Sequence, residues 1–188
     1  MHTLSNPMIP NSEAETPLPK NLVLIGFMGS GKSSVGRLLA TNLGFQFIDT
    51  DALVVQAAGM PIADLFAQQG EAVFRNYEAS ALASLVGRQR LVVATGGGIV
   101  TREENVALIR RIGFVVALTA DEGVIFERVS RNNKRPLLQT PNPRETISAL
   151  LAKRAPLYAA TANLLVDTTS KTHAGVAEEI LAATRCPA

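Results

Sequence analysis

One short segment constrains this chain more than any other. Gly26–Ser33 reads GFMGSGKS and fits the pattern G-x-x-x-x-G-K-[ST]. An apolar run, Leu22–Ile25, precedes it, and a helical pattern, Ser33–Leu43, follows it. In a strand-to-helix turn of this kind, successive backbone N–H groups converge on phosphate oxygens, and the start of the helix adds its positive dipole end. The segment therefore predicts a phosphate-binding loop that holds a nucleotide in an α/β fold.

The loop chemistry assigns roles to particular side chains. The Lys32 ammonium is expected to reach the β- and γ-phosphates, and the Ser33 hydroxyl to bind Mg²⁺, which prefers oxygen ligands. The residues expected to contact ATP in this segment are Gly29, Ser30, Gly31, Lys32, Ser33 and Ser34. The alternative is a glycine-rich turn without a ligand, which the complete pattern and both flanking elements disfavour.

Strand and helix patterns alternate along the rest of the chain. Strands are expected at Leu22–Ile25, Phe45–Ile48, Leu91–Ala94, Phe114–Leu118 and Leu164–Val166. Helices are expected at Ser33–Leu43, 52–58, 61–68, 71–86, Arg102–Arg111, Glu122–Ser130, from Asn142-Pro143 onward, and at Ala174–Thr184. Strands joined by helices favour a three-layer α/β fold with right-handed crossovers, here a five-stranded parallel sheet covered by helices on both faces.

Length and composition indicate one folded domain. A chain of 188 residues with 47 % hydrophobic and 18 % charged residues can bury a core without a disulfide or metal. Residues 1–20 are rich in proline and polar residues, so we expect a flexible tail followed by a single domain over 21–188.

The formal charge and the single cysteine indicate the cellular compartment and the kinds of partner to expect. The formal charge of +2 argues against a protein that coats nucleic acid or an anionic membrane, and no apolar run is long enough to span a bilayer. Cys186 is the sole cysteine, which fits a reducing compartment, and we expect a cytoplasmic protein. His2 and His173 lack metal-ligand spacing and are expected on the surface.

Two carboxylates follow the second predicted strand, at the edge of the sheet where ligands bind in open α/β folds. Asp49 is the expected carboxylate partner of Mg²⁺, through water, since the third strand ends in glycines rather than an acid. Asp51 would point the same way and could orient or deprotonate an attacking hydroxyl. The alternative for this pair is a helix cap before Ala52.

When the other classes of nucleotide-binding protein are excluded, a small phosphotransferase remains. A switch GTPase needs Asn-Lys-x-Asp, whereas Asn133–Pro136 carries proline where the aspartate belongs. A motor or AAA-type ATPase needs a longer chain and an acidic residue that ends an apolar strand.

Over residues 21–184 the chain resembles the shikimate kinase family. The segments that carry the resemblance are Gly26–Ser34, Phe47–Asp51, Ile62–Phe66, Gly70-Glu71 with Phe74-Arg75 and Glu78, Ala94–Gly98, Arg135–Leu138 and Arg154–Tyr158. The resemblance implies a P-loop NTPase fold like that of nucleoside monophosphate kinases, with a mobile lid. It also implies transfer of the ATP γ-phosphoryl group to the 3-hydroxyl of shikimate, one Mg²⁺ ion and a monomer.

On the substrate side, the resemblance implies a helical binding region over about 50–86. It implies that Arg75 and Arg154 hold the shikimate carboxylate, that Asp51 acts on the hydroxyl, and that the turn Gly96, Gly97, Gly98 lets the ring approach backbone amides. From the sequence alone, Arg75 could equally pair with Glu71 or Glu78 on a helix surface.

On the nucleotide side, the resemblance implies a lid over about 131–144 whose Arg135 stabilises charge on the transferred phosphoryl group. It implies that Arg128 stacks on adenine and that Lys171 lies in the adenine-side loop.

Two alternatives to a shikimate kinase stay open on the sequence. One is a related small-metabolite kinase, such as a gluconate kinase or an adenylate-kinase-like protein. The other is a catalytically silent nucleotide-binding regulator, which ATP binding without turnover would reveal.

Overall fold

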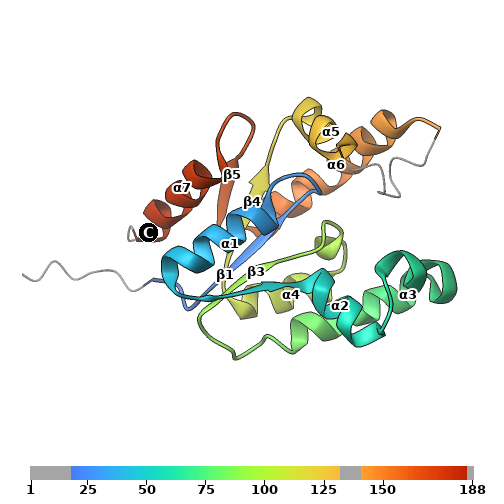
Figure 1. Ribbon diagram of the computed structural model, residues 1–188, viewed down its shortest axis with the longest axis horizontal. Coiled ribbons are helices and arrows are strands. Elements are labelled where there is room, and N and C mark those ends of the chain that lie inside the picture. Colours follow the sequence, from blue (N-terminus) through green and yellow to red (C-terminus); the bar gives the residue numbers. More distant parts are fainter. Residues whose placement is uncertain (1–17, 132–140, 186–188) are drawn as a thin grey trace, which may run out of the picture.

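The sheet is five-stranded and entirely parallel, as predicted. The computed structural model describes residues 18–131 and 141–185, and the strand order is β2-β3-β1-β4-β5 (Figure 1). The strands are β1 (Asn21–Gly26), β2 (Gln46–Asp49), β3 (Leu91–Ala94), β4 (Phe114–Thr119) and β5 (Leu164–Asp167). The central strand β1 pairs in parallel with β3 and β4, so the loops after β1, β2 and β3 leave the same edge of the sheet.

Helices connect these strands close to where the periodicity placed them. They are α1 (Lys32–Leu43), α2 (Thr50–Ala58), α3 (Ile62–Ala83), α4 (Glu103–Ile112), α5 (Glu122–Ser130), α6 (Pro143–Thr161) and α7 (His173–Arg185), with a short 3-10 turn, η1 (Ile99–Thr101). α3 kinks at Gly70, whose φ is 81°, so the predicted interruption between 68 and 71 is a bend within one element. α2 begins two residues earlier than predicted, because the Asp49 side chain caps it.

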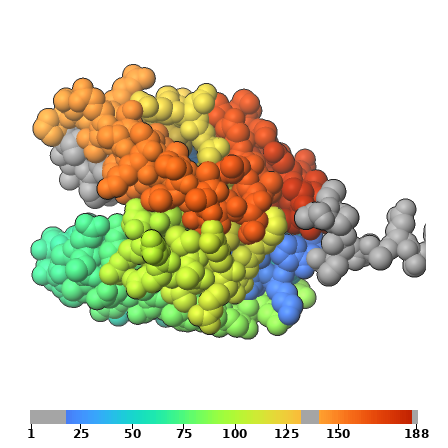
Figure 2. All heavy atoms as spheres, turned by 180° about the vertical axis from the view of Figure 1, so that it is seen from behind, coloured from blue at the N-terminus to red at the C-terminus, as the bar shows by residue number. Residues whose placement is uncertain are grey.

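The sheet separates two hydrophobic layers because side chains alternate along β1. Leu22 and Leu24 pack with residues of α1 and α7, whereas Val23 and Ile25 pack with residues of α3, α4, α5 and α6. Figure 2 views the molecule from behind and shows α4 and α6 on the surface there. Burying a large aliphatic side chain contributes about 1.5–3 kcal/mol, so these layers hold the strand ends in register.

A smaller cluster holds the helix pair that adjoins the sheet. Val54 of α2 packs against Leu65 and Phe74 of α3, which joins the two helices beside the carboxyl ends of β2 and β3. The packing presents the next residue after Phe74, Arg75, toward the loop that follows β3.

Three predictions fall outside the described residues. These are most of the tail over 1–20, the greater part of the lid over 131–144, including Arg135, and Cys186. Within the described ranges, no helix is both long enough and apolar enough to cross a bilayer.

Candidate active site

The loop between β1 and α1 curls around the ammonium group of Lys32. The Lys32 Nζ donates to the carbonyl oxygens of Gly26 and Phe27, both at 2.8 Å, and its side chain is nearly buried. Gly31 precedes the helix in the left-handed region, with φ at 95°, which favours glycine. The loop therefore places a fixed positive charge beside backbone N–H groups at a helix start, the arrangement that binds phosphates.

The Ser33 hydroxyl meets a carboxylate from the next strand. Ser33 Oγ donates to Asp49 Oδ2 at 3.1 Å, while the other Asp49 oxygen accepts the backbone N–H of Asp51 at 3.0 Å. Asp49 is thus both the cap of α2 and the neighbour of the loop serine. The cap predicted as the alternative for this pair is present, and the role of Asp49 toward Mg²⁺ stays a prediction. A hydroxyl and a carboxylate oxygen side by side are hard donors that fit Mg²⁺.

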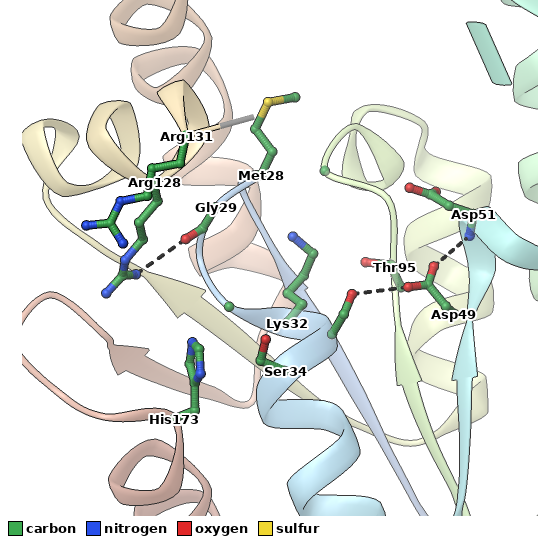
Figure 3. A pocket seen from close by; sticks show the side chains of 13 residues that line it. Met28, Gly29, Lys32, Ser34, Asp49, Asp51, Thr95, Arg128, Arg131 and His173 are labelled. Atoms are coloured by element: carbon green, nitrogen blue, oxygen red, sulfur yellow. Dashed lines mark hydrogen bonds between the residues drawn. The ribbon is translucent and has the colours of Figure 1, made fainter. Parts of the chain in front are cut away.

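An open cavity of about 440 Å³ lies over this loop (Figure 3). Its lining brings together most residues predicted from the loop and from the strand after it: Gly29, Gly31, Lys32, Ser33, Ser34, Asp49 and Asp51, with Arg128 from α5. Ser30 is not among the lining residues, since it is buried in the loop. Among the described residues, no cluster of three or more His, Cys, Asp or Glu could hold a metal without further ligands.

Arg128 ties three segments together at one end of the cavity. Its guanidinium donates to the Gly29 carbonyl at 3.3 Å and to Thr168 at both the hydroxyl (3.1 Å) and the carbonyl (2.8 Å). These bonds hold the guanidinium in place at the cavity, which Arg128 lines. The stacking of Arg128 on adenine stays a prediction.

Lys171 and His173 lie at the connection between β5 and α7 and at the start of α7, respectively. The adenine-side role of Lys171 stays a prediction. Lys171 pairs with Glu179 at 2.6 Å and is absent from the lining of the cavity. His173 is exposed, as predicted, yet it lines the cavity at the start of α7, with its ring 3.4 Å from where a Cβ on Gly31 would stand. No sequence signal placed His173 there, because its position depends on the β5–α7 connection.

Arg75 makes both of the helix pairs that the sequence left open. It contacts Glu71 at 2.9 Å and Glu78 at 2.6 Å, and Glu78 is only 1 % exposed. Burial acts to lower the pKa of Arg75, but the pairs with Glu78 and Glu71 outweigh it, so this pKa is raised. Burial raises the pKa of Glu78, Arg75 opposes that shift, and the nearby charge of Asp51 adds to it. Arg75 is therefore held in place as a cation.

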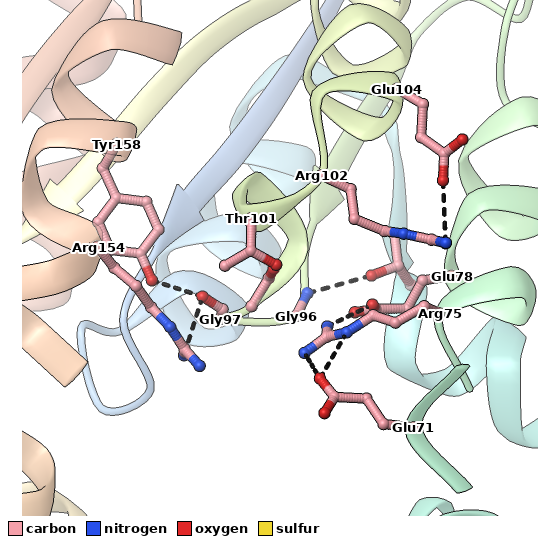
Figure 4. Close-up of polar contacts among 12 residues, drawn as sticks. Glu71, Arg75, Glu78, Gly96, Gly97, Thr101, Arg102, Glu104, Arg154 and Tyr158 are labelled. Atoms are coloured by element: carbon pink, nitrogen blue, oxygen red, sulfur yellow. Dashed lines mark hydrogen bonds and ion pairs between the residues drawn. The ribbon is translucent and has the colours of Figure 1, made fainter. Parts of the chain in front are cut away.

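The turn after β3 passes between the two predicted arginines (Figure 4). A Cβ on Gly98 would lie 2.8 Å from an Arg75 nitrogen, so the guanidinium packs directly on this glycine. On the other side, Arg154 Nη1 donates to the Gly97 carbonyl at 3.3 Å. In Figure 4 the two guanidinium groups flank the turn, one at each end of it, and both lie below it in this view. Two cations from α3 and α6 thus flank one short stretch of backbone, which suits a carboxylate ligand.

Gly96 connects this cation pair to the phosphate-binding side. A Cβ on Gly96 would lie 2.8 Å from Asp51 Oδ1 and 3.0 Å from Glu78 Oε1. The Gly96 N–H donates to the Thr50 hydroxyl at 3.2 Å. Asp51 therefore stands between the cavity over Lys32 and the turn flanked by the arginines. The contact of Gly96, Gly97 and Gly98 with a substrate stays a prediction.

Comparisons with known proteins identify relatives of this chain. The family model for shikimate kinase matches residues 28–185. A shikimate kinase from Thermodesulfovibrio yellowstonii is 47 % identical over 162 residues, which cover 86 % of this chain and 93 % of the relative. The chain belongs to the shikimate kinase family. The shikimate kinase of Acinetobacter baumannii, solved in complex with shikimate, shares the fold with a TM-score of 0.84 at 38 % identity, over 88 % of this chain and 92 % of that one.

A gluconokinase from Sinorhizobium meliloti is more distant. It is 22 % identical over 90 % of this chain and 93 % of its own, with a TM-score of 0.59, and shows a shared fold only. The predicted P-loop kinase fold and the predicted family, a family of ATP-dependent kinases, are confirmed.

The sequence analysis gave no role to two residues that hold parts of the site in place. Tyr158 closed the last segment of the resemblance, and it contacts Gly97 from α6. Thr168 is buried and holds Arg128. Neither contact has a signal in the sequence, because each joins segments far apart in the chain.

Proposed function

We propose that this chain transfers the γ-phosphoryl group of ATP to the 3-hydroxyl of shikimate, producing shikimate 3-phosphate and ADP. The observation that carries the proposal is the placement of Arg75 and Arg154 on either side of the Gly97-Gly98 turn, one residue beyond the contact between Gly96 and Asp51. Shikimate carries a carboxylate at one end of a small ring and hydroxyls at the other. The site offers cations for the first and a carboxylate for the second.

The residues around the cavity support a transfer between two bound ligands. Lys32 and the backbone N–H groups of the loop bind the phosphates and neutralise charge that develops on the transferred group. Asp51 accepts the proton of the attacking hydroxyl, or orients that hydroxyl. Arg75 and Arg154 fix the acceptor ring through its carboxylate, which supplies the proximity that a transfer between two ligands requires.

The cofactor is proposed to be one Mg²⁺ ion bound together with ATP. Ser33 Oγ and Asp49 would hold it, directly or through water, and their oxygens already lie 3.1 Å apart. When bound, this ion withdraws electron density from the β- and γ-phosphate oxygens.

Three attributes of the protein stay predictions: a monomer, a cytoplasmic location, and no nucleic-acid or membrane partner. The near-neutral formal charge of +2 supports the last of these. Size-exclusion chromatography with light scattering tests the monomer.

ADP release from Mg-ATP tests the proposed reaction. The rate is compared with shikimate, D-gluconate, AMP and no acceptor. We expect strong stimulation by shikimate alone. Stimulation by D-gluconate or AMP instead would retain the nucleotide site and contradict the acceptor. ATP binding without stimulation by any acceptor would favour the regulator.

The role of Asp51 has its own test. We expect Asp51→Asn to leave ATP affinity nearly unchanged while phosphoryl transfer to shikimate collapses. If ATP binding is lost together with transfer, Asp51 acts on the nucleotide and its proposed role is wrong.

A further inference from the structure

We propose that Tyr158 is a positioning residue for the acceptor. Its hydroxyl holds the Gly97 carbonyl, so that the substrate-facing turn keeps its shape when Arg154 engages the acceptor carboxylate. This inference rests on the proposed function and deepens it, since it concerns the acceptor half of the same site.

Two donors from one helix meet a single carbonyl oxygen. Tyr158 Oη donates to the Gly97 carbonyl at 2.5 Å, and Arg154 Nη1 donates to the same oxygen at 3.3 Å. The first distance is at the short limit for an O–H···O bond, and the second is long for an N–H···O bond. Arg154 and Tyr158 stand four residues apart on α6, and therefore on one face of the helix. Figure 4 shows both side chains converging on Gly97.

The two donors differ in how firmly the protein holds them. Tyr158 is 3 % exposed, and its ring belongs to the core layer that also contains Phe27 and Ile125. Burial raises the pKa of Tyr158 to about 12, so the phenol stays a neutral donor at physiological pH. Arg154 is only half-buried, and its guanidinium can follow a ligand.

When the acceptor binds, Arg154 would therefore exchange its bond to the Gly97 carbonyl for bonds to the carboxylate, and Tyr158 would keep its bond to that carbonyl. An arginine bound to a carboxylate pairs two ionised groups in short hydrogen bonds that are often bidentate, whereas the contact of Arg154 with the neutral Gly97 carbonyl is a single bond of 3.3 Å. Arg154 then gives up its long contact with Gly97. Because Gly97 lies between two further glycines, its peptide can rotate readily unless something restrains it. Among the described residues, Tyr158 is then the remaining side chain that donates to this carbonyl.

The test compares two single-hydroxyl deletions. Tyr158→Phe removes the donor hydroxyl and keeps the ring in the core. The matched control is Tyr77→Phe on α3, since Tyr77 is the other of the two tyrosines in the sequence. We expect Tyr158→Phe to raise the KM for shikimate about tenfold while the KM for Mg-ATP changes less than about twofold, equivalent to about 1.4 kcal/mol on the acceptor side alone. Tyr77→Phe is expected to match the wild type.

A spectroscopic measurement separates positioning from simple packing. The chain has no tryptophan, so in Tyr77→Phe the fluorescence of the protein comes from Tyr158. We expect shikimate to change this emission, because Arg154 leaves the shared carbonyl. We also expect Tyr158→Phe to unfold cooperatively.

Several outcomes of these measurements would contradict the positioning role of Tyr158. An unchanged KM for shikimate in an active Tyr158→Phe variant contradicts it, as does a silent Tyr158 emission at saturating shikimate. Equal rises in both KM values indicate a packing role only. A wild-type chain without shikimate-dependent ADP release contradicts the proposed function itself, and the inference with it.

Discussion

Replacing Gly98 with alanine tests the acceptor site through one methyl group. Gly98 has φ −95° and ψ 0°, which alanine adopts, so the substitution strains no backbone. The new Cβ would stand 2.8 Å and 2.9 Å from the two terminal nitrogens of Arg75 and 3.3 Å from its Cζ. Ordinary contact requires the guanidinium to retreat by roughly half an ångström or more. The ion pair with buried Glu78, at 2.6 Å, opposes that retreat.

The displacement should appear in the acceptor kinetics. A hydrogen bond to a charged group contributes about 1.5–3 kcal/mol, and a misplacement of about 1 Å can cost 100-fold in rate. We therefore expect kcat/KM for shikimate to fall by about 10- to 100-fold in Gly98→Ala, with the KM for Mg-ATP nearly unchanged. Steady-state ADP release with each substrate varied in turn measures both.

A second glycine provides the control. Gly123 lies on α5, and a Cβ there would meet nothing within 4 Å. Gly123→Ala should leave both KM values at wild-type levels and gain about 0.4–1 kcal/mol of stability. If Gly98→Ala binds shikimate within about twofold of the wild type, then Arg75 does not hold the carboxylate in the position described, and the reasoning fails.

Three further predictions concern the phosphate side and the pH dependence. Lys32→Ala should abolish turnover and still unfold cooperatively in urea, and near-wild-type kcat would refute the loop assignment. Asp49→Asn keeps an oxygen that can accept the Asp51 N–H but removes a negative charge. The Mg²⁺ concentration for half-maximal rate should therefore rise about tenfold, with little change in the urea midpoint of unfolding. An unchanged Mg²⁺ requirement would exclude Asp49 from the metal site. Because the pKa of Tyr158 is raised to about 12 from its ordinary 10.0, the folded chain binds more protons than the unfolded chain between these pH values, and stability should fall as pH rises through that window. In urea unfolding, the stability of Tyr158→Phe should fall less steeply than that of the wild type over the same pH window. An equal fall in both proteins would show that Tyr158 is not the group with the raised pKa.

The sequence was sufficient for the sheet and for the loop between β1 and α1 because those signals are local. The apolar run Leu22–Ile25, the loop that follows it and the helix after that are contiguous, so a pattern within a dozen residues determines them. The same holds for Asp49 and Asp51, whose position at the end of β2 and two residues later places them at the carboxyl edge of the sheet.

The acceptor side was less accessible because its contacts join distant segments. Arg75 approaches Gly98 only because Val54, Leu65 and Phe74 pack α2 against α3, and no spacing in the sequence encodes that packing. The exposed side of a helix was the simplest expectation for Glu78, yet it is 1 % exposed and shares the neighbourhood of Gly96 with Asp51. Without the family resemblance, Arg75 would have remained one member of an ordinary helix ion pair.

The position of the transferred phosphoryl group tests the central claim most directly. After incubation of the protein with Mg-ATP and shikimate, phosphorus and proton NMR of the product identify the oxygen that carries the phosphate. The account predicts a single phosphate ester on the 3-hydroxyl, formed in step with ADP. An ester on another hydroxyl, or ADP formed together with free phosphate and no ester, would contradict the placement of Asp51, Arg75 and Arg154 around the acceptor.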